Sequence, residues 1–220
     1  MGTDKPLLYG YWRSTAAYRV RIALNLKGIA WTSVPVDLVA EGGAQHGAAY
    51  RALNPAGLVP ALAIDGKLLT QSLAICEYLE EARPQPALLP ADAGQRAWVR
   101  ALALDVACDI HPLNNLRVQQ YLRGTHGVDD AGIHAWMSHW IAAGFSGIEA
   151  QLQRSGSAGA CCLGDTPGLA DIFIVAQVYN AERFNVDLGP YSRIRQIAAH
   201  CKTLSAFAEA APGRQDDAPA

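Results

Sequence analysis

The sequence lacks a charge excess of either sign. Its 18 basic and 20 acidic side chains leave a formal net charge of -2, and neither kind forms a long block. Nucleic-acid-binding domains usually carry a clustered basic excess, so this balance argues against a nucleic-acid partner. No apolar run approaches the ~20 residues that a membrane helix needs, and residues 1–6 are polar. We therefore expect a cytoplasmic protein with no membrane or secretory role.

Metal-ligand spacing is also missing. The cysteines include no Cys-x-x-Cys pair, and His134 and His139 are five residues apart, so they do not share a helix face. We expect reduced thiols and no metal site. The cysteines are Cys76, Cys108, Cys161, Cys162 and Cys201.

The composition is that of a folded protein whose pattern changes near residue 90. Half of the 220 residues are hydrophobic and 17% are charged, enough for a large core in one domain or two small ones. Before residue 90, periodicity predicts the order β-α-β-α-β-β-α, with Asp65-Gly66 as a hairpin turn. The expected strands are 7–12, 31–38, 59–64 and 67–70, and the expected helices are 18–27, 47–53 and 72–82.

The second part of the chain reads as helical throughout. Pro84, Pro86 and Pro90 mark a linker, after which small apolar residues recur at helical spacing. The expected helices are 93–123, 129–154, 168–183 and 190–209, followed by a frayed polar tail at 212–220. We therefore expect an N-terminal domain at 1–85, a linker at 86–91 and an all-helical domain at 92–220.

Three short motifs in the first part could bind a ligand. Ser14-Thr15 lies at a helix start, where free N–H groups attract an anion, although either residue could be a plain N-cap. Gln71-Ser72 opens another helix with the same two interpretations. Val59-Pro60 could present its backbone to a peptide-like ligand if the bond is cis, although most such bonds are trans.

Arginine supplies the remaining candidates. Arg13, Arg117 and Arg183 carry planar, permanently charged groups that suit carboxylates, but nothing in the sequence brings them together, and each could be a solvated surface residue. His111 and Asn115 belong to the polar stretch HPLNN in an otherwise apolar region, which could equally be a helix kink.

Taken together, the motifs resemble the zeta class of the glutathione transferase family. The element order, Val59-Pro60, Gln71-Ser72 and the proline linker fit that family, and RSTAAYRVRIAL (13–24) is similar to the class signature. GDTPGLAD (164–171) and RFNVDL (183–188) resemble its helical-domain motifs. Within the class, DIHPLNN (109–115) and the three arginines resemble bacterial glutathione-dependent maleylpyruvate isomerases. The resemblance covers about residues 7–210.

The resemblance implies an α/β domain of thioredoxin-like fold followed by an all-α domain, a glutathione cofactor and a homodimer. Ser14 would stabilise the glutathione thiolate, with Thr15 beside it. Val59 would pair its backbone with the cysteinyl part of glutathione, ahead of a cis-Pro60. Gln71 and Ser72 would hold the γ-glutamyl end.

The helical domain would complete both sites. By the same resemblance, His111 and Asn115 would reach glutathione from that domain. Arg13, Arg117 and Arg183 would hold the carboxylates of a small diacid substrate, and Arg13 and Arg183 would also act in catalysis with Ser14.

The function implied is cis–trans isomerisation of maleylpyruvate to fumarylpyruvate in gentisate-type aromatic catabolism. Addition of a thiolate makes the double bond single, and its expulsion after rotation regenerates glutathione. The alternatives are maleylacetoacetate isomerisation in tyrosine and phenylalanine catabolism, conjugation of glutathione to small electrophiles, and a non-catalytic binding module.

Two positions depart from the family pattern. Ala16 replaces the usual cysteine of the class signature, so the thiol must come from glutathione and not from the protein. Gly168 replaces the usual Ser or Thr of a capping box, so only Asp171 can cap that helix start.

Overall fold

The computed structural model describes residues 5–219, so most of the polar stretch 1–6 and the last residue of the expected tail lie outside the described residues. The described chain forms two compact units. One runs up to Leu88 and includes the residues from Leu204 onward, and the other is Leu89–Thr203. Within residues 5–219, no helix is long and apolar enough to span a bilayer.

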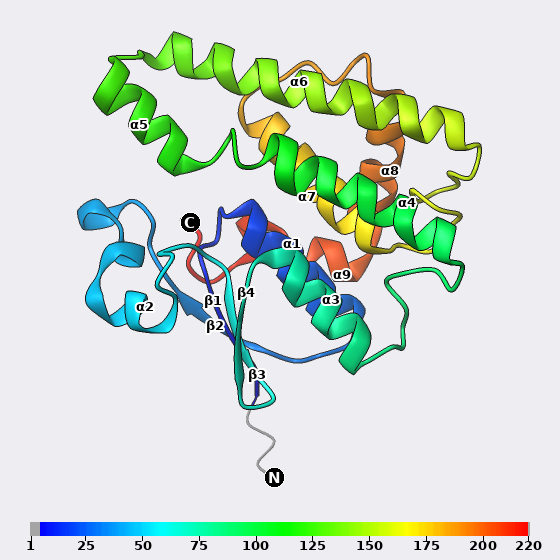
Figure 1. Ribbon diagram of the computed structural model, residues 1–220, viewed down its shortest axis with the longest axis horizontal. Helices are drawn as coiled ribbons and strands as arrows, with labels where there is room; N and C mark the ends of the chain where they lie inside the picture. Colours follow the sequence, from blue (N-terminus) through cyan, green and yellow to red (C-terminus); the bar gives the residue numbers. More distant parts are fainter. Residues whose placement is uncertain (1–4, 220) are drawn as a thin grey trace. The chain divides into compact units, whose positions relative to one another are not determined.

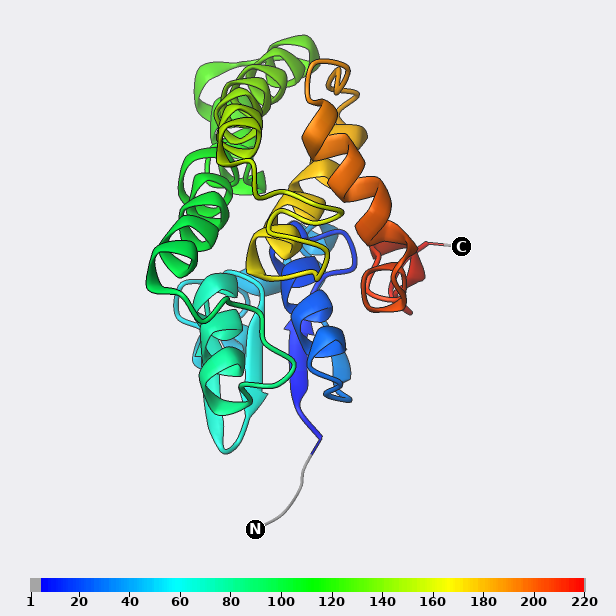
Figure 2. The ribbon, with the colours of Figure 1, turned by 90° about the vertical axis from the view of Figure 1, so that its right-hand side faces the viewer.

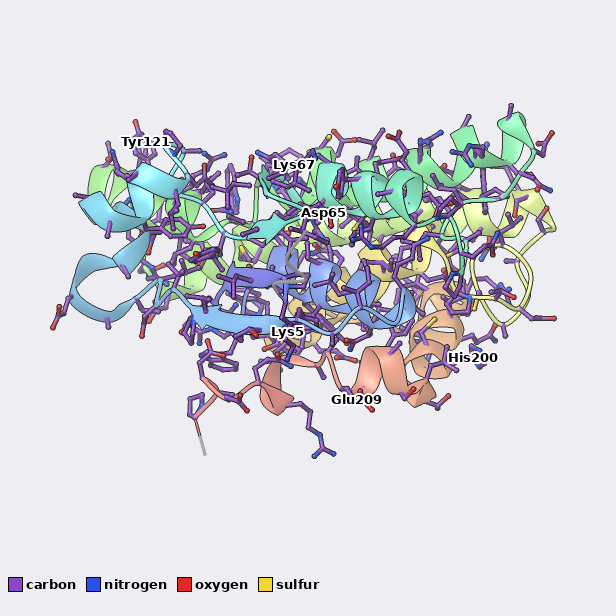
Figure 3. The ribbon with its side chains drawn as sticks, turned by 90° about the horizontal axis from the view of Figure 1, so that it is seen from below. Lys5, Asp65, Lys67, Tyr121, His200 and Glu209 are labelled. Atoms are coloured by element: carbon purple, nitrogen blue, oxygen red, sulfur yellow. The ribbon has the colours of Figure 1, made fainter. Side chains whose placement is uncertain are left out.

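The first unit is built on a four-stranded sheet of order β2-β1-β3-β4 (Figure 1). β1 pairs parallel with β2 and antiparallel with β3, and β3 pairs antiparallel with β4. Asp65 and Gly66 join β3 to β4 with φ of 52° and 70°, as the expected hairpin turn requires. Asp65 and Lys67 mark this turn in Figure 3. The strands are β1 (Leu7–Gly10), β2 (Thr32–Pro35), β3 (Ala61–Ile64) and β4 (Lys67–Thr70).

Two helices of this unit, α1 and α3, lie side by side (Figure 1). They bury apolar side chains that include Leu24 and Leu79. Near their C-terminal ends, Lys27 Nζ donates to Glu80 Oε2 at 2.6 Å. The expected order β-α-β-α-β-β-α is confirmed. The helices are α1 (Thr15–Leu26), α2 (Ala48–Leu53), α3 (Ser72–Ala82) and α9 (Ser205–Ala208), with 3-10 turns η1 (Ala40–Gly42), η2 (Ala44–His46) and η4 (Pro212–Arg214).

The C-terminal segment from Leu204 onward belongs to the first unit, not to the helical unit in which we expected it. In Figure 2 this segment, drawn in red, lies against α1. Phe207 is fully buried, and Tyr18 Oη on α1 donates to its carbonyl at 3.4 Å. The expected frayed tail is therefore wrong over its described part. Polar composition suggested fraying, but Pro212 is buried, and Asp217 Oδ2 accepts from the amide of Trp12 in the turn before α1 at 2.9 Å.

The second unit is helical, as expected. α7 is buried around almost its whole circumference and packs against α4 and α8, which explains why its sequence is apolar on every face. The helices are α4 (Ala93–Leu104), the π-helical segment η3 (Asp105–Ile110), α5 (Leu116–His126), α6 (Asp130–Ser155), α7 (Leu169–Arg183) and α8 (Ser192–Thr203).

The single helix expected over 93–123 is interrupted. Residues 105–110 are π-helical, and the amide of His111 donates to Val106 O at 2.8 Å, five residues back. A new helix, α5, begins after Asn115, whose side chain caps it. Pro112 lacks an amide hydrogen, which prevents regular helix from continuing through this stretch. The kink that the HPLNN stretch suggested is therefore present.

The start of α7 confirms the expected half of a capping box. Asp171 Oδ2 accepts from the amide of Gly168 at 2.8 Å, whereas glycine has no side chain to return a bond. Asp171 Oδ1 also accepts from the amide of Cys162 at 2.8 Å. Asp171 thus ties the preceding loop to the helix, and the helix forms without the residue that the family usually places at 168.

Candidate functional site

Ser14 lies at the turn between β1 and α1 and is the N-cap of that helix. Its Oγ accepts from the amide of Ala17 at 3.2 Å, and its own amide donates to Tyr11 O at 2.9 Å. A hydroxyl that accepts through its oxygen can still donate its hydrogen. The N-cap role and the anion-binding role are therefore compatible, with Thr15 buried beside Ser14 as the first helical residue.

Arg13 precedes this cap and is half-buried. Its Cζ lies 5.9 Å from the ring centroid of Tyr11 and 5.4 Å from that of Trp12, within the range of cation–π attraction. The pKa of Asp37 is lowered mainly by hydrogen bonds from the amides of Ala40 and Val39, and Arg13 adds a smaller attraction. Two aromatic rings thus hold the guanidinium at the turn that carries Ser14.

The Val59–Pro60 peptide bond is cis, as the resemblance implied. The residue before Val59 is firmly anchored, because Leu58 O accepts from Tyr50 Oη and from Asn54 Nδ2, each at 2.7 Å. Burial raises the pKa of Tyr50, so its phenol stays a donor. The backbone of Val59 is therefore held in place from one side by two side-chain donors.

Gln71 and Ser72 begin α3. Gln71 has φ of 67°, in the left-handed region that non-glycine residues rarely adopt, and such positions often occur at ligand-binding sites. Ser72 Oγ accepts from Arg19 Nη1 at 3.3 Å. Arg19 is only 1% exposed, and burial lowers its pKa to about 10, so it is still charged at neutral pH. This places a buried positive charge directly behind the start of α3.

Arg19 is the residue that our sequence reasoning missed. A charged residue inside the apolar stretch of α1 was the available signal, but we used that stretch only to match the class signature. A buried charge needs a reason, because desolvating it is costly. Its bond to the Ser72 hydroxyl provides one at the expected γ-glutamyl position.

The second unit carries the other predicted residues. Asn115 caps α5, and its Oδ1 accepts from the amide of Arg117 at 3.1 Å, which brings these two residues to one helix start. His111 follows the π-helical segment directly. Arg183 is the last residue of α7, and its Cζ lies 4.7 Å from the ring centroid of Phe184. Both arginines are exposed within this unit.

Spacing also failed to reveal a buried cluster in the second unit. Cys161, Asp171 and Cys201 each offer a ligand atom, and these atoms lie within 4.8 Å of one another. The three are distant in sequence, so no spacing rule links them. Burial raises the pKa of the Cys161 thiol to about 12, and the pKa of Cys201 is raised for the same reason. The thiols are thus protonated at neutral pH, and both Asp171 oxygens already accept from the amides described above.

Comparisons with known proteins agree on one family. Residues 8–87 match the family model described as glutathione S-transferase, N-terminal domain. A probable maleylacetoacetate isomerase of Vibrio cholerae is 53% identical over 213 residues, which cover 96% of this chain and 98% of that protein.

Two solved structures extend the agreement to the fold. A holo maleylpyruvate isomerase, described as a bacterial glutathione transferase of the zeta class, is 51% identical with a TM-score of 0.94 and covers 97% of this chain and 100% of that one. A maleylacetoacetate isomerase of Anaeromyxobacter dehalogenans, solved with dicarboxyethyl glutathione and citrate in the active site, is 41% identical with a TM-score of 0.86 and covers 98% of both chains.

Proposed function

Because the chain belongs to the zeta class of the glutathione S-transferase family, we propose that it is a glutathione-dependent cis–trans isomerase that converts maleylpyruvate to fumarylpyruvate. The observation that carries this proposal is the 51% identity to a zeta-class maleylpyruvate isomerase across 97% of the chain. The Anaeromyxobacter relative supports the chemistry, because its ligand joins glutathione to a dicarboxylic group.

The first unit suits glutathione. The Ser14 hydroxyl and the N-terminal end of α1 favour a thiolate, the anchored backbone at Val59 suits a peptide, and the Ser72 hydroxyl with Arg19 behind it suits the γ-glutamyl carboxylate. When bound, glutathione supplies a thiolate that adds reversibly to the substrate's double bond.

The remaining steps belong to side chains of this protein. Ser14 donates a hydrogen bond to the sulfur and so keeps it anionic at neutral pH. Arg13, held over Tyr11 and Trp12, binds a substrate carboxylate and stabilises the negative charge that spreads onto the substrate when sulfur adds. Arg117 and Arg183 hold the second carboxylate, and His111 and Asn115 contact glutathione. We place the enzyme in the cytoplasm, as a homodimer.

Maleylacetoacetate is the second candidate substrate, because the Vibrio cholerae relative at 53% identity is named a probable maleylacetoacetate isomerase. It shares the cis-enedioate chemistry, so the same residues serve both. An assay with each substrate in parallel, at limiting glutathione, tests the proposal by absorbance and by thiol titration.

We expect many product molecules per glutathione, with no loss of free thiol and faster turnover of maleylpyruvate. The Ser14→Ala variant should lose most of this activity, whereas Ser146→Ala, an exposed serine on α6, should keep it. Stoichiometric consumption of glutathione would instead identify a conjugating transferase, and absence of turnover with either substrate would favour a binding module. Faster turnover of maleylacetoacetate would reassign the substrate and leave the chemistry intact.

A further inference from the structure

The turn that carries Arg13 and Ser14 is held from behind by the C-terminal segment, residues 204–219. The amide of Trp12 donates to Asp217 Oδ2 at 2.9 Å. The carbonyl of Trp12 accepts from Arg21 Nη2 at 3.0 Å, and Arg21 Nε donates to Ala210 O at 2.9 Å. The acceptor for the Trp12 amide, Asp217, thus belongs to this segment, and the donor to the Trp12 carbonyl, Arg21, is held by a carbonyl of the segment.

These two bonds act on adjacent peptide groups. The amide hydrogen of Trp12 belongs to the peptide that joins it to Tyr11, and its carbonyl belongs to the peptide that joins it to Arg13. Each peptide is planar, so a hydrogen bond to each of the two planes restrains the two backbone torsions of Trp12. Those torsions set the direction in which the chain enters Arg13 and the direction of the Cα–Cβ bond of Trp12, whose ring centroid lies 5.4 Å from the Arg13 Cζ.

The segment itself is well braced. Gln215 Nε2 donates to the carbonyls of Glu209 and Ala211, each at 3.0 Å, and Asn25 Nδ2 on α1 donates to Ala206 O at 3.0 Å. Arg21 is only 3% exposed. Glu209 marks this segment, drawn in red, in Figure 3. The carboxylate of Asp217 therefore meets Trp12 from a rigid support.

We propose that Asp217 and Arg21 are positioning residues that set the β1–α1 turn for the isomerase reaction, so that the C-terminal segment forms part of the catalytic architecture without touching substrate. This inference rests on the proposed function for its kinetic readout. Its structural readout, the protection of the Trp12 amide, is independent of any activity.

The test compares Asp217→Ala with Asp217→Asn and with Asp216→Ala in the full-length protein. Asparagine keeps an acceptor oxygen, and Asp216 is an exposed neighbour whose removal changes the net charge equally. We expect Asp217→Ala to lower kcat about three- to ten-fold, the net contribution of one hydrogen bond, with the half-saturating glutathione concentration unchanged. Asp217→Asn should recover most of the rate, and Asp216→Ala should match wild type.

Hydrogen exchange measured by mass spectrometry on the peptide that contains Trp12 gives the second readout. Asp217→Ala should speed exchange there, and Asp216→Ala should not. Equal kinetics and exchange for the two alanine variants would overturn the inference, as would a rate loss in Asp217→Ala that only follows a loss of folded protein. If wild type does not isomerise either substrate, the proposed function fails, and the exchange comparison alone decides whether Asp217 holds the turn.

Discussion

The Lys27–Glu80 pair allows the sharpest stability prediction. The Lys27 side chain is 0% exposed and the Glu80 side chain 8%. All three ammonium hydrogens are used, because Nζ donates to Glu80 Oε2 at 2.6 Å, to Arg83 O at 2.8 Å and to Pro86 O at 2.5 Å. Lys27→Met removes the charge and leaves one carboxylate and two carbonyls without that donor.

Removing one partner of a buried ion pair costs about 3–5 kcal/mol, because the other charge stays buried. With a urea m-value of about 2 kcal/mol/M, the unfolding midpoint should fall by roughly 2 M. The assay is urea unfolding followed by circular dichroism. The double variant Lys27→Met/Glu80→Leu should lose less than the sum of its single variants, since no unpaired charge remains.

The matched control is the ion pair of Lys202 and Glu182, in which Nζ lies 2.7 Å from Oε1. Their side chains are 39% and 47% exposed. Lys202→Met should cost less than about 1 kcal/mol, because solvent screens the pair. If Lys27→Met were no more destabilising than Lys202→Met, the argument from burial would be refuted.

Two further predictions concern packing and pH. In α6, a Cβ at Gly144 would overlap the buried side chain of Ile110, whereas a Cβ at Gly147 would meet open space. In thermal or urea unfolding, Gly144→Ala should therefore destabilise the protein by about 1–2 kcal/mol, and Gly147→Ala should stabilise it by up to about 1 kcal/mol. A stabilised Gly144→Ala would contradict this packing. Hydrogen bonds from Arg83, then Tyr78, lower the pKa of Asp65 to about 2. Because this pKa lies below the unfolded value of about 3.9, its stabilisation is complete above about pH 4 and is lost as pH falls toward 2. The side chains of Asp65 and Arg83 are about one-third exposed, so Asp65→Asn should remove less than about 1 kcal/mol of this pH-dependent stability in urea unfolding. If the variant lost stability between about pH 4 and pH 2 as much as wild type does, Asp65 would not be the group responsible.

Local signals predicted the parts of the fold that local chemistry decides. Asp65-Gly66 predicted the hairpin because both residues tolerate positive φ. Ser72 indicated the start of α3, although it is the first helical residue and not the expected cap, since the N-cap is Gln71, which makes no side-chain cap bond. The sequence pattern did not reveal the π-helical turn before His111, because a one-residue change in hydrogen bonding leaves the apolar periodicity almost unchanged.

Contacts between distant residues could not be predicted at all. Nothing near Trp12 indicates that Asp217 binds its amide, since 205 positions separate them. The same holds for Arg19 and Ser72, which lie 53 positions apart. The family resemblance supplied candidate positions such as Ser14 and Val59, but the groups that hold those positions became visible only in three dimensions.

In the proposed mechanism, Ser14 keeps the glutathione sulfur anionic at the start of α1. The direct measurement is the pKa of the bound thiol, followed by thiolate ultraviolet absorbance in wild type, Ser14→Ala and Ser14→Asp at saturating glutathione. Aspartate caps a helix as well as serine but offers an anion instead of a donor. We expect a bound-thiol pKa below that of free glutathione in wild type. The pKa should rise by about 1–2 in Ser14→Ala, the value of one charge-assisted hydrogen bond, and by more in Ser14→Asp, where a carboxylate also repels the thiolate. A bound thiol that titrates identically in all three proteins would contradict this mechanism.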